Sequence, residues 1–253
     1  MDDVEDKAIL RRGIPSAHLI YGSPLTIQGV IFKAVLLLEE MLQYLEDRRV
    51  IKTVYLYGHW KQFQIYKTRN RNVLYRQLTL ICPTFEDYEA LVNGKSLGSI
   101  SWGVEFLKLF ANNQEYEFTE KFMVDLGVFA QIYNDYINLH NPKYSKFRIC
   151  FDDIDERKFS FPIIHAIRTF PEDQQILNVF KERRKDLETK KNVVSLLENF
   201  GSFAYTKKVL ENHLAGIVEE IDKMKLGKNS KLQRVLENIL ERLDTEAFFD
   251  CTD

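Results

Sequence analysis

Three carboxylates crowd the start of the chain, where a helix is expected over residues 2–12. Asp6 lies four residues after Asp2 and three after Asp3, so the three would share one helical face. Like charges at this spacing repel unless a cation lies between them, and Mg²⁺ prefers oxygen ligands of this kind beside a phosphate. The spacing therefore indicates a magnesium site. The alternative is an acidic turn that complements the helix dipole.

Polar side chains also interrupt a largely apolar helix expected over 118–140. They stand at the spacing of a core stripe, and they are Gln131, Asn134, Asp135 and Asn138. Leaving such groups buried and unpaired costs on the order of 1–3 kcal/mol each. We expect the stripe to line a wet cavity or to bind a ligand, unless it simply faces solvent. A similar interruption occurs at Lys95 and Ser96 within a helix expected over 84–111.

Apolar residues recur at helical spacing almost throughout the chain, and no stretch alternates with the period of a strand. The charged segment 141–158 is predicted to be a structureless lid, because a loop of that length usually has a function. Breaks at Gly, Pro and Asn separate the predicted helices, which span 2–12, 16–45, 47–67, 84–111, 118–140, 160–169, 172–184, 187–199, 203–225 and 230–247.

Length and composition favour one all-α domain over residues 1–253. The net charge of −2 provides no basic field for nucleic acid. The three cysteines are far apart and lack metal-binding spacing. No apolar run approaches the roughly 18 residues of a membrane span, and the acidic start is unlike a targeting peptide. A cytoplasmic location is expected.

Several motifs together resemble the trans-isoprenyl diphosphate synthases. The acidic start followed by Leu10-Arg11-Arg12-Gly13 is similar to the family's first aspartate-rich motif. Further matches occur in the family's order, at 82–84, 94–96, 131–136 and 158–167. The last of these, together with 201–203, is most similar to animal and fungal geranylgeranyl diphosphate synthases.

The resemblance implies an isoprenoid-synthase-type helical bundle around a central cavity. It also implies a Mg²⁺-dependent, head-to-tail condensation of an allylic diphosphate with isopentenyl diphosphate in isoprenoid biosynthesis. The implied metal ligands are Asp2, Asp3, Asp6, Asn134 and Asp135. The implied diphosphate-binding residues are Arg11, Lys95, Ser96, Gln131, Arg148 and Lys158, with Arg12 facing isopentenyl diphosphate. Lys95, Gln131 and Lys158 are the expected catalytic residues.

Departures from the family pattern keep three functions open. The chain begins one residue before the first motif, where the family has earlier helices, so we expect a bundle lacking its first helices. Asn134 stands where the second motif has an aspartate, and Arg148 takes a lysine position. The chain could condense prenyl units, ionise an allylic diphosphate as a terpene synthase does, or serve as a non-catalytic subunit. A homo-oligomer, or a hetero-oligomer with an intact homologue, is expected.

Overall fold

A computed structural model describes residues 2–5, 7–11, 13–44, 79–94, 100–101, 103–104, 119–140, 151–223 and 231–245. Apart from one short hairpin, the regular structure in these ranges is helical, which confirms the all-α prediction. The helix expected over 47–67 lies outside the described residues. Within the described ranges, no helix combines the length and apolar character needed to cross a bilayer.

The N-terminal segment corrects two predicted helices. Helix α1 (Asp2–Glu5) ends early, and strand β1 (Leu10–Arg11) pairs antiparallel with β2 (Ile14–Pro15). The prediction of one helix over 2–12 was wrong because Gly13, with φ 80°, turns the chain back on itself. The helix expected over 16–45 is divided into α2 (Ala17–Tyr21) and α3 (Ser23–Tyr44) at Gly22, which has φ 76°.

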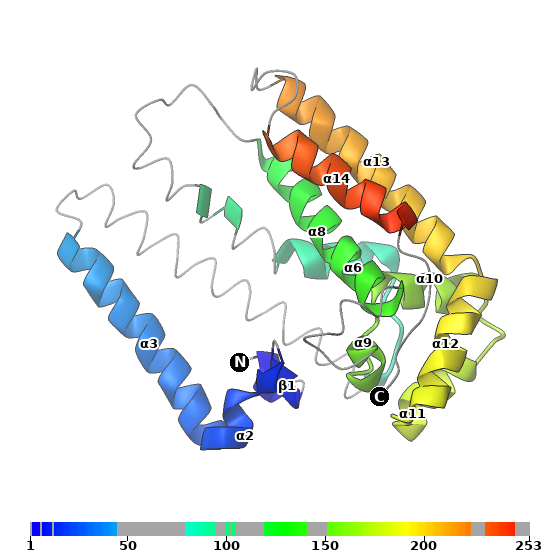
Figure 1. Ribbon diagram of the computed structural model, residues 1–253, viewed down its shortest axis with the longest axis horizontal. Helices are drawn as coiled ribbons and strands as arrows, with labels where there is room; N and C mark the ends of the chain where they lie inside the picture. The colour runs from blue at the N-terminus through cyan, green and yellow to red at the C-terminus, as the bar shows by residue number, and fades with distance from the viewer. Residues whose placement is uncertain are drawn as a thin grey trace.

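The other described helices pack into one bundle, in which α13 is among the longest (Figure 1). Helix α13 packs against α8, α10, α12 and α14. Its buried core includes Phe129, Ile132, Phe180, Leu210 and Ile217. The bounds of these helices are α6 Phe85–Val92, α8 Glu120–His140, α9 Asp152–Asp155, α10 Phe161–Thr169, α11 Gln175–Glu182, α12 Leu187–Asn199, α13 Ser202–Lys223 and α14 Lys231–Thr245.

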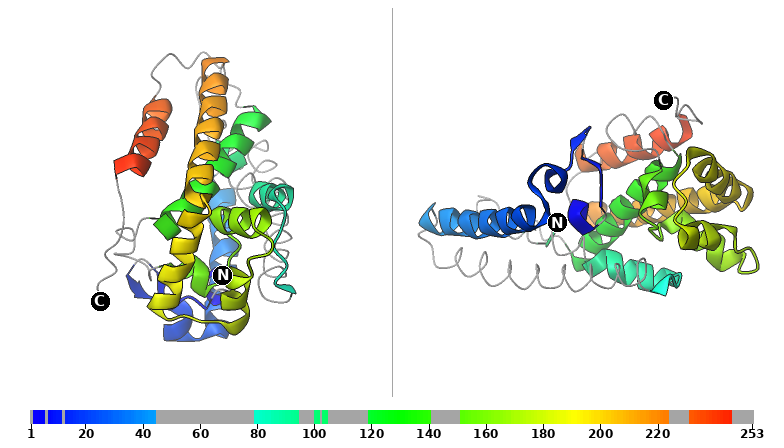
Figure 2. Two further views of the ribbon diagram at one scale, coloured as in Figure 1. Left: turned by 90° about the vertical axis from the view of Figure 1, so that its right-hand side faces the viewer. Right: turned by 90° about the horizontal axis from the view of Figure 1, so that it is seen from below.

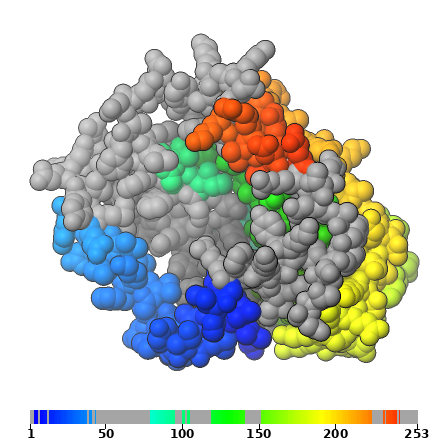
Figure 3. All heavy atoms as spheres, in the orientation of Figure 1, coloured from blue at the N-terminus to red at the C-terminus, as the bar shows by residue number. Residues whose placement is uncertain are grey.

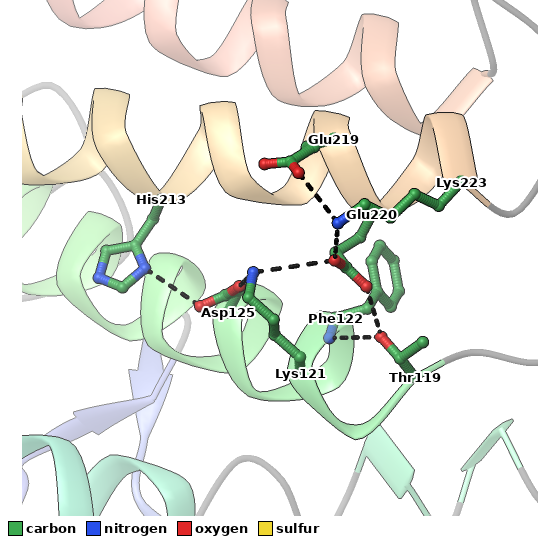
Figure 4. Close-up of polar contacts among 8 residues, drawn as sticks. All are labelled: Thr119, Lys121, Phe122, Asp125, His213, Glu219, Glu220 and Lys223. Atoms are coloured by element: carbon green, nitrogen blue, oxygen red, sulfur yellow. Dashed lines mark hydrogen bonds and ion pairs between the residues drawn. The ribbon is translucent and has the colours of Figure 1, made fainter.

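Polar contacts fix the start of α8 against α13 (Figure 4). The Thr119 hydroxyl donates to Glu220 Oε2 at 2.8 Å and accepts the Phe122 N–H at 3.1 Å, so one side chain caps α8 and ties it to α13. Asp125 lies 3.0 Å from Lys121 Nζ and 3.6 Å from His213 Nδ1. These contacts hold the helix that carries the polar stripe.

The segment predicted as a structureless lid is ordered in its described part. Residues 151–158 contain α9, and Phe151 and Ile154 are buried in the core. The prediction was wrong for this part because one of its charged residues, Asp153, is buried and paired with Lys158. Residues 141–150 lie outside the described residues.

Helix α3 lies apart from α11, α12 and α13. Figure 1 and the right-hand view of Figure 2 show α3 on one side of the molecule and these three helices on the other, and Figure 3 shows the atoms of α3 and of α12 at opposite edges of one face. Helices α2 and α3 expose many large apolar side chains, namely Leu19, Ile20, Tyr21, Leu25, Val30, Ile31, Phe32, Val35 and Leu37.

Candidate functional site

Asp135 is the centre of a buried polar cluster on α8. Its Oδ1 accepts hydrogen bonds from Gln131 Nε2 at 2.8 Å and from Lys158 Nζ at 2.9 Å. Its Oδ2 accepts from the Tyr88 hydroxyl at 2.8 Å and from the Phe161 N–H at 3.0 Å. A carboxylate offers about four lone-pair sites. All of them are used here, and the residue is fully buried.

Lys158 brings a second carboxylate into the cluster. Its Nζ lies 3.1 Å from each oxygen of Asp153, and its side chain is 16% exposed. Burial alone would lower the pKa of Lys158, but the carboxylates of Asp135 and Asp153 outweigh it and raise that pKa above its usual range. Burial raises the pKa of Asp153 to about 7, against the opposing effect of the Lys158 ammonium. Two acids thus share one buried cation.

Helix α9 is held from both neighbouring sides. On α8, the Asn138 side-chain amide donates to Asp152, and its oxygen accepts the Asp153 N–H at 3.3 Å. On α12, Lys190 Nζ lies 2.9 Å from Asp155. Two non-glycine residues flanking α9, Phe151 and Arg157, have positive φ angles, a conformation that persists where the surrounding structure enforces it. The stripe residue Asn138 therefore positions α9.

Tyr88 is held in place by the start of α6. Thr84 and Asp87 form a capping box there, and Arg168 on α10 donates to the Pro83 carbonyl at 3.0 Å and to the Cys82 carbonyl. Burial and the nearby Asp135 carboxylate raise the pKa of Tyr88 well above its usual value, so the phenol is a neutral donor. Its contact with Asp135 spans 47 residues of sequence.

The first motif places two predicted site residues together. Arg11 Nη1 on β1 lies 3.3 Å from Asp3 Oδ1 on α1, and both side chains are partly exposed. Asp2 belongs to α1, but its side chain lies outside the described residues. Several other predicted site residues also lie outside them, namely Asp6, Arg12, Lys95, Ser96 and Arg148.

The predicted magnesium ligands differ in whether their oxygens are already bonded to protein groups. Asn134 on α8 is partly buried, and no described residue hydrogen-bonds its side chain, so its amide oxygen is available. Asp135 offers no unused lone pair, and Asp3 shares its carboxylate with Arg11. No group of three or more metal-binding side chains occurs within the described part of the chain. Among the predicted ligands whose side chains the structure describes, Asn134 is therefore the one whose oxygen no described residue already binds.

A model of the family described as "Polyprenyl synthetase" matches residues 1–197. The chain belongs to this family. It is 36% identical over 243 residues to a protein named "Terpene synthase" from Matsumurasca onukii, an alignment that covers 95% of this chain and 76% of that one. These matches confirm the resemblance inferred from the motifs.

Relatives named "Geranylgeranyl pyrophosphate synthase" are also similar to the chain. The protein from Mucor circinelloides f. lusitanicus is 33% identical over 241 residues, and that from Dictyostelium discoideum is 31% identical over 240 residues. Each alignment covers 94% of this chain and 76% of the relative. The described helical bundle agrees with the all-α isoprenoid-synthase fold expected for the polyprenyl synthetase family.

Proposed function

We propose that this protein is a Mg²⁺-dependent prenyltransferase of the geranylgeranyl diphosphate synthase kind, acting on an allylic diphosphate and isopentenyl diphosphate. The observation that carries the proposal is the family match over residues 1–197, which includes the α8 stripe and the Lys158 segment. In support, the fold brings Lys158 into contact with Asp135, which lies one helical turn from its partner Gln131 on α8.

Each residue of the site has a separate task in this proposal. Asp2, Asp3 and Asp6 would hold Mg²⁺ together with the Asn134 amide oxygen, and the bound ion would neutralise the diphosphate charge as it leaves. Gln131 would face that diphosphate from α8, and Lys158 would face it from the segment that follows α9. Gln131 uses one of its two amide hydrogens on Asp135, which leaves the other for a substrate oxygen. Asp135 orients both donors.

The remaining predicted residues complete the proposal. Arg11, Lys95, Ser96 and Arg148 would add contacts to the allylic diphosphate, and Arg12 would face isopentenyl diphosphate. A metal-ligand role for Asp135 stays a prediction, and it would require the carboxylate to exchange one of its present partners. A cytoplasmic location and a single domain over 1–253 also stay predictions.

A second function is favoured by two specific observations. The relative from Matsumurasca onukii is named "Terpene synthase", and Asn134 gives the second motif an amide where a carboxylate is expected. A protein that ionises an allylic diphosphate needs only one substrate and the metal. The choice between the two functions is therefore a choice between one and two bound diphosphates.

Product analysis decides between these functions. Purified protein and Mg²⁺ are incubated with labelled isopentenyl diphosphate and, in turn, each allylic diphosphate. A labelled, longer prenyl diphosphate supports condensation. An unlabelled hydrocarbon or prenyl alcohol from the allylic substrate supports the terpene-synthase-like function. No product from any pair contradicts both and leaves the non-catalytic subunit.

Calorimetry with a bisphosphonate analogue tests the metal site. The proposal requires tighter binding in the presence of Mg²⁺ and loss of that gain in an Asp2→Ala, Asp6→Ala double variant. Equal binding with and without the metal would contradict it.

Association into oligomers is also part of the proposal. Large exposed apolar patches on soluble proteins often mark interaction surfaces, and α2 and α3 expose a series of large apolar side chains. Sedimentation velocity over a range of protein concentrations measures the state directly, and a monomer throughout would contradict it.

A further inference from the structure

Helix α9 carries two similar ion pairs, whose lysine partners come from different parts of the chain. Asp153 and Asp155 each contact one lysine ammonium, at 3.1 Å and 2.9 Å. Lys190, the partner of Asp155, comes from α12. Lys158, the partner of Asp153, also contacts Asp135, which is the centre of the α8 cluster. Of these two ion pairs, the Asp153 pair is therefore the one that joins α9 to Asp135.

We propose that Asp153 is a positioning residue, which clamps the Lys158 ammonium against Asp135 and so fixes this cation at the edge of the α8 polar stripe. The proposal deepens the proposed function, and it rests on that function for the diphosphate the cation would face. Asp153 itself is not proposed to touch substrate. It acts through Lys158.

Charge neutralisation alone does not account for a second buried carboxylate. One carboxylate balances one ammonium, and burying a further charge costs free energy unless other interactions offset it. The second carboxylate instead fixes the orientation of the ammonium. Asp135 contacts Nζ from α8, and Asp153 contacts it with both oxygens from the segment that includes Lys158 itself. An ammonium fixed from two elements keeps one orientation, whereas a single partner would let the flexible lysine side chain move.

The backbone of α9 is organised to hold Asp153 in this place. The Asn138 side-chain oxygen accepts the Asp153 N–H, and the Asp153 carbonyl accepts the Lys158 N–H at 2.8 Å. The neighbouring Ile154 is buried in the core. Both the carboxylate and the backbone of Asp153 are thus tied to the residues that flank the site.

Amine labelling of the full chain tests the clamp without assuming any activity. Folded protein is treated with an acetylating reagent at mildly alkaline pH, and mass spectrometry follows Lys158 and Lys190 separately. In Asp153→Asn, labelling of Lys158 should rise severalfold, because the ammonium loses one of the two partners that hold it in place. Labelling of Lys190 should not change. Asp155→Asn is the matched control, and it should expose Lys190 but not Lys158.

Two further variants keep the test decisive. Asp153→Glu restores the carboxylate and should return Lys158 labelling to within about twofold of the parent. If Asp153→Asn does not fold, as judged by circular dichroism, Asp153→Ser takes its place with the same expectation. Unchanged labelling of Lys158 in the folded neutral variant would overturn the clamp. So would an equal rise at Lys190, because that would show general loosening of α9.

Binding of the bisphosphonate analogue in Mg²⁺ provides the second measurement. Asp153→Asn should weaken binding about tenfold, whereas Asp155→Asn should bind as the parent does. Equal losses in the two variants would overturn the positioning role. If the parent itself does not bind the analogue, the proposed function fails, and the labelling result still decides whether Asp153 clamps Lys158.

Discussion

Lys158 carries a positive charge inside the protein, and two carboxylates hold it there. Removing one member of a buried charged group leaves the remaining charges uncompensated. Asp135 and Asp153 would then face each other as like charges without the ammonium that joins them. This makes Lys158 a residue on which folding depends, in addition to any contact with substrate.

Replacing Lys158 with methionine should cost about 3–5 kcal/mol of unfolding free energy, because the carboxylates lose their shared cation. Urea denaturation measures the loss. Lys121→Met is the matched control, since Lys121 pairs with Asp125 but is 61% exposed, and it should cost less than about 1 kcal/mol. Similar losses of unfolding free energy in both variants would show that the folded protein does not depend on Lys158 to neutralise Asp135 and Asp153.

His165 predicts a pH dependence of stability. Its Nδ1 lies 2.9 Å from Ser202 Oγ and its ring stacks on Tyr205, and burial lowers its pKa below the usual value. The unfolded chain therefore binds a proton at a higher pH than the folded chain does. The contribution of His165 to stability is fully present above about pH 6.5, and it falls as the pH drops from there toward the lower pKa of the folded state.

Thermal melts between pH 7.5 and pH 5.5 measure this effect. As the pH falls, the melting temperature of the parent should drop relative to that of His165→Gln. The comparison with the variant removes the opposite contribution of Asp153, whose raised pKa of about 7 stabilises the folded protein over the same range. Burial also lowers the pKa of His140, so the difference from the parent should be larger in a double variant with His140→Gln. A slope unchanged in both variants would show that neither histidine is responsible.

Helix α13 contains a glycine, Gly216, at a position that has room for a larger side chain. An added Cβ at Gly216 would lie 3.6 Å from Asp125 Oδ2 and 3.8 Å from Lys121 Nζ, which is ordinary contact. Gly216→Ala should therefore stabilise the protein by roughly 0.5–1 kcal/mol through helix propensity.

Gly201, just before α13, gives the opposite expectation. Its φ of 65° is strained for other residues, so Gly201→Ala should destabilise the protein by roughly 1 kcal/mol, although the added Cβ meets open space. Denaturation curves of the two variants should shift in opposite directions. A shift in the same direction would contradict the argument.

Helical periodicity predicted the long helices well, but it did not predict the turns that depend on a glycine with a positive φ angle. The expected helix 187–199 has the observed bounds of α12, and the bounds expected as 118–140 and 230–247 lie within two residues of those of α8 and α14. The hairpin at 10–15 and the break at Gly22 were missed because a glycine in a positive-φ turn does not alter the apolar pattern around it.

The candidate site was predictable in its members but not in its connections. The motifs grouped Gln131, Asp135 and Lys158, and the structure brings these three together. The stripe was expected to line a wet cavity or to bind a ligand, and the partners of its Asp135 in the structure are protein groups. Asp153 was missed as a site residue because a charged loop looks solvated in sequence. Its burial depends on tertiary packing that no local pattern contains.

Across the whole molecule, burial is unevenly distributed. Helices α8, α10, α12 and α13 contribute most of the described core, whereas no described side chain of α2 or α3 is buried. Local opening is easier where few apolar contacts hold a segment. The N-terminal helices should therefore open without unfolding the bundle.

Hydrogen exchange measured by mass spectrometry tests this difference. Backbone amides of α8 and α13 should exchange at least about a hundredfold more slowly than those of α3, once intrinsic rates are removed. The comparison is made at several protein concentrations. Equal protection of α3 at every concentration would contradict the expected independence, and protection that grows with concentration would reveal association through this helix.

The position of Asp135 has a consequence for how such a sequence drifts when catalysis is no longer selected. Its carboxylate accepts the Phe161 N–H at the start of α10, where the side chain of the preceding Ser160 provides no cap, and it also anchors Tyr88 on α6. Three helices therefore depend on it for folding. A duplicated gene under selection only for a stable product would retain this aspartate, while the partly buried neighbour Asn134 could vary freely. An aspartate at position 135 therefore indicates a protein that folds, whether or not it is an enzyme. The residue at position 134 says more about whether the protein is catalytic.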